Sequence, residues 1–83
     1  MYLYEAVQIC SGTCWLFRRS GWMENRGVAV YGEPVSVARN HMHGDYDHSD
    51  LVVVRRTTED VLLGIFKPDA DDVLATDYEI VTP

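Results

Sequence analysis

The sequence predicts a single α+β domain over residues 1–83, with an N-terminal helix, a small antiparallel sheet and a short helix before the last strand. Three observations support this fold class. Apolar residues recur at helical spacing near the N-terminus, β-branched runs alternate with turn residues, and an acidic cap precedes a short apolar run near the C-terminus. At 83 residues, the chain is too short for a TIM barrel or a dinucleotide-binding fold, which need more than about 150 residues.

Residues 3–11 carry the helical pattern. Their apolar members follow the i, i+3, i+4, i+7 spacing of one helix face: Leu3, Ala6, Val7 and Cys10. Gly12 follows directly and is a typical helix stop. The first element is therefore predicted to be a helix with one apolar face.

Two strands are predicted next, over residues 14–19 and 27–32. The first, CWLFRR, is aromatic and ends at the Ser20-Gly21 turn pair. The second, GVAVYG, is rich in valine and ends just before Pro34. Both segments are short, as expected for a small sheet.

The middle of the chain combines a polar segment with a hairpin. Residues 33–50 are rich in His and Asp and predict a long loop, with Val35 and Val37 as a brief strand. Residues 51–56 (LVVVRR) are β-branched, and residues 61–66 return after a polar turn. These two segments predict an antiparallel hairpin.

A short helix and a strand complete the predicted fold. Pro68 ends the preceding strand, and Asp69 or Asp71 can then cap a helix that runs through residues 73–75. Residues 78–81 predict the last strand. The order helix, strands, helix, strand is typical of an α+β domain on an antiparallel sheet.

The charge balance limits the classes of partner. A formal net charge of −6 argues against a nucleic-acid duplex or an anionic membrane as the main partner. Arginine nevertheless suits phosphate and carboxylate, so a local anion site stays open beside the alternative that these cations only balance thirteen carboxylates. Six of the seven cations are arginines: Arg18, Arg19, Arg26, Arg39, Arg55 and Arg56.

The N-terminus and the cysteines point to a cytoplasmic protein. The first ten residues lack a basic targeting region, and no apolar run approaches the roughly 20 residues of a membrane span. Cys10 and Cys14 do not form a secreted disulfide framework and are interpreted as reduced core or edge residues rather than as a redox pair.

The polar segment carries one metal-like pattern, with alternating residues that an extended chain would direct to one side. It resembles the HxHxDH signature of the metallo-β-lactamase fold, with Tyr46 and Asp47 inserted before the last histidine. We favour a solvated loop and predict no tightly bound metal; a metal-dependent hydrolase is the less favoured alternative. The residues concerned are His41, His43, Asp45, Asp47 and His48.

Aromatic and charged residues near two turns suggest a nucleotide site. Trp22, Phe66 and Tyr78 lie at predicted element edges, where an aromatic ring can stack on a base or pack as half-buried core. Arg19 can meet phosphate. Asp72 and Asp77 can accept hydrogen bonds from ribose or base donors, or serve only as helix cap and surface charge. No nucleophile motif accompanies them, so no catalytic residue is predicted.

The same residues carry a family resemblance. The chain resembles the small phage-encoded Thoeris anti-defence proteins of the second type. The shared features are an early Glu5-Ala6 pair, the Arg19-x-Gly21-Trp22 turn followed by Asn25, and the C-terminal pattern Phe66-x-Pro68-Asp69-x-x-Asp72-x-x-Ala75-x-Asp77-Tyr78-Glu79-Ile80-Val81. Phe66 and Tyr78 stand where the family has Trp, and Asp69 where it has Ser. The match covers both ends of the chain but not residues 33–50.

The resemblance implies a non-enzymatic protein without cofactors, which forms homodimers or homotetramers. Such proteins bind a cyclic ADP-ribose-type signal, glycocyclic ADP-ribose among them, or a cyclic oligonucleotide, and sequester it intact so that the host effector is not activated. The implied ligand-binding residues are Arg19, Trp22, Asn25, Phe66, Asp72, Asp77 and Tyr78. The small size independently favours self-association. The alternative function is a small acidic protein–protein inhibitor or structural module.

Overall fold

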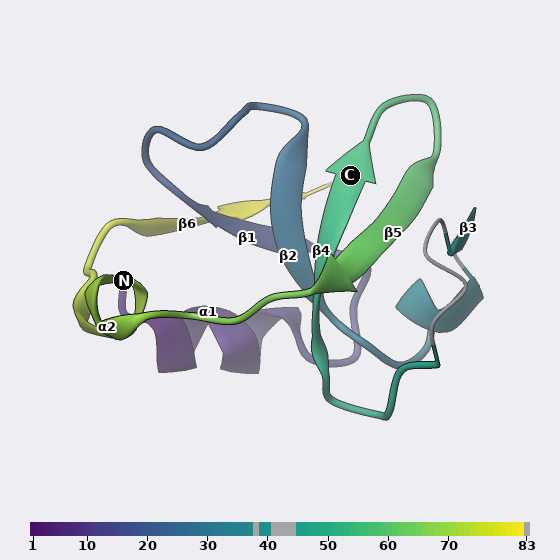
Figure 1. Cartoon of the computed structure of the whole chain (residues 1–83), viewed down its shortest axis with the longest axis horizontal. Helices are drawn as coiled ribbons and strands as arrows, with labels where there is room; N and C mark the ends of the chain where they lie inside the picture. The colour runs from purple at the N-terminus through teal and green to yellow at the C-terminus, as the bar shows by residue number, and fades with distance from the viewer. Residues whose placement is uncertain (38, 41–44, 83) are drawn as a thin grey trace.

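One six-stranded sheet, in the order β3-β5-β4-β2-β1-β6, organises the computed structural model, which describes residues 1–37, 39–40 and 45–82 (Figure 1). Five neighbouring strands pair antiparallel, and β3 joins the outer edge of β5 in parallel. The predicted α+β class is confirmed. The elements are α1 (Leu3–Cys10), β1 (Leu16–Arg19), β2 (Arg26–Val30), the 3₁₀ turn η1 (Val35–Val37), β3 (Arg39–Asn40), β4 (Leu51–Arg56), β5 (Asp60–Ile65), α2 (Ala70–Leu74) and β6 (Tyr78–Val81).

Helix α1 covers one face of the sheet (Figure 1). It starts where the Glu5 carboxylate accepts a hydrogen bond from the Tyr2 N–H at 2.9 Å, and its end is bound by Thr13, whose hydroxyl donates to the Cys10 carbonyl at 2.7 Å. The predicted apolar face is confirmed, because Ala6 and Cys10 are fully buried. The core on this side comprises Ala6, Cys10, Phe17, Val28, Val30 and Tyr78.

The opposite face of the sheet carries a second core cluster, closed by η1. This cluster consists of Leu16, Ala29, Val35, Val52, Val54 and Leu62. The predicted brief strand at Val35 and Val37 is wrong: the Ser36 N–H donates to the Gly32 carbonyl at 2.8 Å, which curls the segment into a turn. Pro34 has a backbone φ suited to the start of such a turn, which outweighs the alternating Val-Ser-Val pattern.

The boundaries of β1, β2, β4, β5 and β6 lie within two residues of the predicted ones, whereas β3 falls in the segment predicted as a loop. Strand β1 starts at Leu16, two residues after the start of the predicted segment, and β2 covers Arg26–Val30. Gly27 permits their close approach, since a Cβ at this position would lie 2.9 Å from the Leu16 Cβ and 3.2 Å from the Phe17 carbonyl oxygen. The hairpin β4–β5 is confirmed, with a β-bulge between Val53 and Val54.

The C-terminal helix and strand meet the N-terminus. The predicted cap of α2 is confirmed at Asp69, whose carboxylate accepts a hydrogen bond from the Asp72 N–H at 2.9 Å. The N-terminal ammonium of Met1 donates to the Thr76 carbonyl at 2.8 Å, so chain start, α2 and β6 lie together (Figure 1). In the described ranges, no helix has the length and apolar character needed to cross a bilayer.

Candidate ligand-binding site

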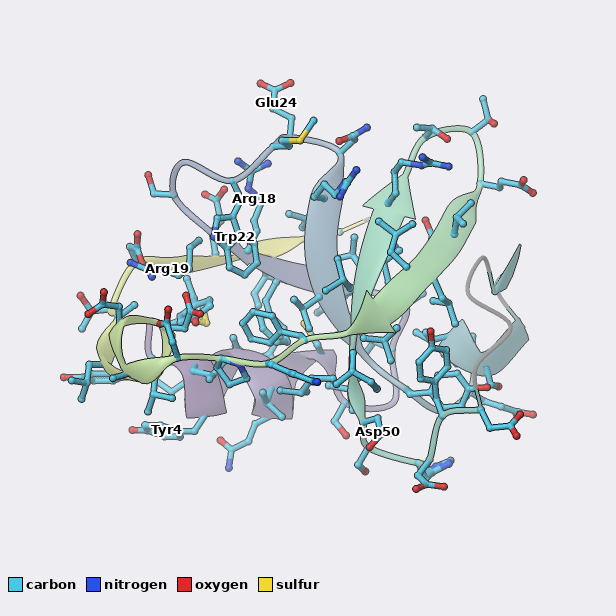
Figure 2. All side chains as sticks on the ribbon, in the orientation of Figure 1. Tyr4, Arg18, Arg19, Trp22, Glu24 and Asp50 are labelled. Atoms are coloured by element: carbon cyan, nitrogen blue, oxygen red, sulfur yellow. The ribbon has the colours of Figure 1, made fainter. Side chains whose placement is uncertain are left out.

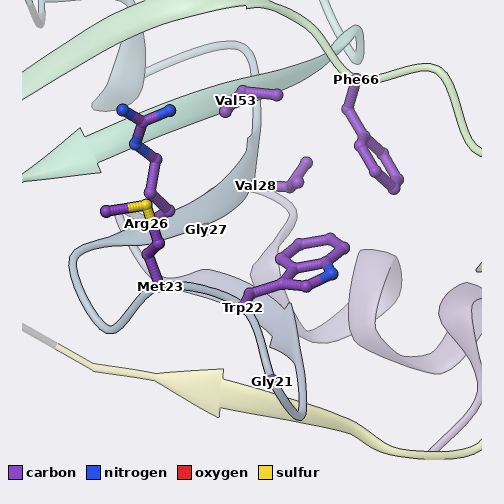
Figure 3. A pocket seen from close by; sticks show the side chains of 8 residues that line it. All are labelled: Gly21, Trp22, Met23, Arg26, Gly27, Val28, Val53 and Phe66. Carbon is purple, nitrogen blue, oxygen red and sulfur yellow. The ribbon is translucent and has the colours of Figure 1, made fainter.

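A pocket of about 390 Å³ opens beside the turn between β1 and β2. Figure 3 shows Trp22 and Phe66 at one end, Arg26 and Met23 at the other, and Val28 and Val53 between them. Its volume falls within the range of small-molecule sites. We call it the aromatic pocket; it is lined by Gly21, Trp22, Met23, Arg26, Gly27, Val28, Val53 and Phe66.

Arg18 positions the turn that carries two of the pocket residues. Its guanidinium donates to the Trp22 carbonyl at 2.8 Å and to the Met23 carbonyl at 3.4 Å, and its Nε lies 3.2 Å from a carboxylate oxygen of Glu79. The backbone closes the same turn, with the Arg26 N–H donating to the Met23 carbonyl at 3.0 Å. Strands β1 and β6 therefore hold in place the turn that carries Trp22 and Met23.

Trp22 links the pocket to the core. Its ring meets Phe66 at a centroid distance of 5.6 Å and Tyr78 at 6.4 Å, both edge-to-face. Phe66 and Tyr78 in turn pack edge-to-face against the fully buried Phe17. Edge-to-face contacts hold an aromatic ring in a defined orientation, so Trp22 presents a fixed surface to the pocket.

Arg19, Asp72 and Asp77 form a second feature outside the pocket, here called the ion-pair cluster. The Arg19 guanidinium donates to Asp72 at 3.0 Å and to Asp77 at 3.1 Å. These hydrogen bonds raise the pKa of Arg19 above its ordinary value. Partial burial alone would raise the pKa of Asp72, but hydrogen bonds from Asp69 and Arg19, with the Arg19 charge, outweigh it and lower the pKa below its ordinary value.

Tyr78 connects the ion-pair cluster to the core. Its side chain is buried, and its hydroxyl donates to the Asp72 carbonyl at 2.7 Å. Burial raises the pKa of Tyr78, and the charge of Asp72 raises it further, so the phenol stays protonated at neutral pH. Tyr78 is therefore a core residue that fixes α2 against β6, with its ring facing inward.

The predicted site residues divide between these two features. Trp22 and Phe66 line the aromatic pocket. The others do not line it: Arg19, Asp72 and Asp77 bind one another, Tyr78 is buried, and Asn25 accepts the Arg56 N–H through its backbone carbonyl at 2.7 Å. A phosphate that approached Arg19 would therefore have to compete with the carboxylates of Asp72 and Asp77 for its guanidinium.

Sequence reasoning missed four side chains of the pocket. Met23, Arg26, Val28 and Val53 line it, although no motif includes them. A partial signal was available: Arg26 starts the strand that follows the Trp22 turn, and alternation places Val28 on the same face. Val53 was beyond local reasoning, since its approach depends on the pairing of β2 with β4.

The structure describes both cysteines but only part of the segment that carries the metal-like pattern. In residues 1–37, 39–40 and 45–82, no group of three or more His, Cys, Asp or Glu side chains could hold a metal ion. His41 and His43 lie outside the described residues, so the metal prediction stays a prediction. Cys10 and Cys14 are free thiols, and burial raises the pKa of Cys10 to about 11, so it is no nucleophile at neutral pH.

A second hollow lies between α1, α2 and the start of β4. It has a volume of about 460 Å³ and is mainly apolar, with Leu3, Val7, Leu51 and Val73 among its lining residues. Tyr4 projects outward beside it (Figure 2), and Leu74 of α2 is 74% exposed. The two helices thus present apolar side chains to the outside.

The chain matches no protein-family model, no curated protein and no solved structure.

Proposed function

We propose that this protein binds a cyclic nucleotide signal, of the cyclic ADP-ribose type or a cyclic oligonucleotide, and sequesters it intact in the cytoplasm of the host cell. The observation that carries the proposal is the aromatic pocket, in which an oriented indole and a phenyl ring lie across an apolar floor from a guanidinium. A base stacked on one aromatic ring contributes about 1–3 kcal/mol of binding free energy. The family resemblance supports the same ligand class.

The chemistry of the pocket favours binding over turnover. None of its eight lining residues, all within the described part of the chain, has a side chain that can act as nucleophile or general base at neutral pH. Arginine remains protonated and serves only as a donor. A bound signal would therefore be retained without cleavage.

A release experiment tests this function. The protein is mixed with cyclic ADP-ribose, glycocyclic ADP-ribose or a cyclic dinucleotide, separated from free ligand and heat-denatured, and the supernatant is analysed by chromatography. Sequestration predicts stoichiometric recovery of the intact ligand. Recovery of cleaved products would establish an enzyme instead, and absence of uptake of all three ligands would favour the acidic protein–protein inhibitor.

We further propose that copies of the chain associate through the apolar side chains of α1 and α2. A core of this size gains stability from shared apolar surface. Light scattering at micromolar concentration is expected to give a dimer or tetramer mass, and Leu74→Asp is expected to lower it toward the monomer. Met23→Asp is the matched control, since Met23 is 63% exposed but lies at the aromatic pocket. A monomer mass for the unmodified protein would refute self-association.

A further inference from the structure

Two arginines lie opposite each other at the end of the aromatic pocket away from the indole. Arg26 of β2 pairs in register with Arg55 of β4, as Val28 does with Val53 two residues along. Directly paired residues project from the same face of a sheet, with Cβ atoms about 4.5–5.5 Å apart. The arginine pair, Arg26 and Arg55, therefore extends from the face that forms the pocket floor.

The arginine pair differs from Arg18, Arg19 and Arg56 in its partners. Arg18 lies 3.2 Å from Glu79, Arg19 binds two carboxylates, and Arg56 donates to Asp60 at 2.8 Å. Neither member of the arginine pair has a carboxylate partner among residues 1–37, 39–40 and 45–82. Like charges directly opposite on a sheet are destabilising, and here no anion of the described chain offsets the repulsion.

Arg26 also carries a buried hydrogen-bond donor that is unsatisfied within the described residues. Its Nε is buried and has no acceptor in the described structure, although the residue lines the pocket. Within the described residues, the Arg18 Nε and Arg56 Nη1 are likewise buried without a well-aligned acceptor, but a carboxylate lies beside each of those guanidiniums, Glu79 at 3.2 Å and Asp60 at 2.8 Å. Arg26 alone among these three combines an unsatisfied donor with an unneutralised charge.

We infer that the arginine pair binds the phosphate groups of the nucleotide, with Arg26 in direct contact and Arg55 adding charge behind it. This inference rests on the proposed function for the identity of the ligand, and it moves the phosphate contact from Arg19 to Arg26. A guanidinium fork matches phosphate oxygens bidentately. A base on Trp22 and a phosphate on Arg26 would occupy the two ends of the pocket seen in Figure 3.

Two probes, inorganic pyrophosphate and cyclic ADP-ribose, separate this inference from the proposed function. Binding is measured by calorimetry and by NMR of the arginine Nε–H signals, in the unmodified protein and in Arg26→Gln, Arg55→Gln and Lys67→Gln. The last variant is the matched control, because Lys67 is exposed and its replacement changes the net charge equally. We expect Arg26→Gln to weaken binding of both probes at least about tenfold, Arg55→Gln about threefold, and Lys67→Gln less than twofold.

A second measurement excludes a merely structural role. Because the arginine pair is mutually repulsive in the ligand-free protein, Arg26→Gln is expected to leave the urea midpoint unchanged or to raise it, and Arg26→Lys to recover part of the binding. Equal effects of Arg26→Gln and Lys67→Gln, or no pyrophosphate binding by the unmodified protein, would overturn the inference. Pyrophosphate binding that depends on Arg26, without uptake of cyclic ADP-ribose or any other cyclic nucleotide, would support the anion site and refute the proposed function.

Discussion

Arg19 and Arg26 begin and end the same turn, yet their guanidiniums meet opposite surroundings. Arg19 completes β1 and donates to two carboxylates, Asp72 and Asp77. Arg26 starts β2, faces another arginine across the ladder and has a buried Nε that finds no acceptor in the described part of the chain. Carboxylates neutralise the guanidinium at the start of the turn, whereas the guanidinium at its end has no carboxylate partner among the described residues.

This difference separates an arginine that stabilises the fold from one that, within the described residues, is free to meet an anionic ligand. The chain has thirteen carboxylates against seven cations, so acidic partners are plentiful, and an arginine pair without one is unfavourable for the folded protein alone. Folded proteins satisfy hydrogen-bonding groups and pair charges almost everywhere, and the exceptions are found mainly at functional sites. We therefore propose that the ion-pair cluster holds α2 and β6 against β1, and that the aromatic pocket with the arginine pair binds the ligand.

The largest expected effect comes from Trp22. This residue lines the aromatic pocket and packs against Tyr78, which connects the ion-pair cluster to the core. Trp22→Ala removes the stacking surface and should weaken cyclic nucleotide binding at least about tenfold, equivalent to about 1.4 kcal/mol. It should also lower the melting temperature, because the ring packs on Phe66 and Tyr78, while circular dichroism shows the fold retained. Trp22→Phe keeps an aromatic face and should restore most of the binding. Unchanged affinity in folded Trp22→Ala would make Trp22 a core residue only.

A smaller effect, on stability and not on ligand binding, is expected from the cap of α2, which lies beside the ion-pair cluster. Asp69→Ala removes the acceptor of the Asp72 N–H and should lower the free energy of unfolding by about 1 kcal/mol, a shift in melting temperature of about 4–8 °C for a domain of this size. Ligand affinity should change less than twofold. Asp69→Asn, which keeps an acceptor at the cap, is the matched control. A large loss of affinity in Asp69→Ala would contradict the division into two regions.

The smallest effect is a pH dependence carried by Asp72. Its pKa is lowered in the folded protein from the ordinary value of 3.8, so its ionised form stabilises the fold at pH above that value. This stabilisation is lost as the pH falls below 3.8 through the lower folded pKa. Urea unfolding at pH 7, 4 and 3 should show Asp72→Asn less stable than the unmodified protein at pH 7, with the gap narrowing toward pH 3. A gap that stays constant would show that the carboxylate charge is not involved.

Local pattern was a good guide to the elements and a weaker one to the site. The apolar spacing of α1, the hairpin of β4 and β5 and the cap at Asp69 are properties of neighbouring residues, and each was predicted from the sequence. The turn at Val35–Val37 was mistaken for a strand because alternation alone does not show where backbone hydrogen bonds form. Of the predicted site residues, Trp22 and Phe66 lie together in the structure, with ring centroids 5.6 Å apart, and both line the aromatic pocket.

The sequence by itself determined which residues can stack on a base or meet an anion, because aromatic faces and guanidinium charge belong to the side chains themselves. Only the tertiary structure decided which arginine has its charge neutralised. The antiparallel register of β1 with β6 pairs Arg19 with Tyr78 and so brings it beside the neighbouring Asp77, whereas the register of β2 with β4 sets Arg26 against Arg55. These pairings join segments far apart in the chain, and the electrostatic surroundings of a side chain depend on distances that only folding establishes.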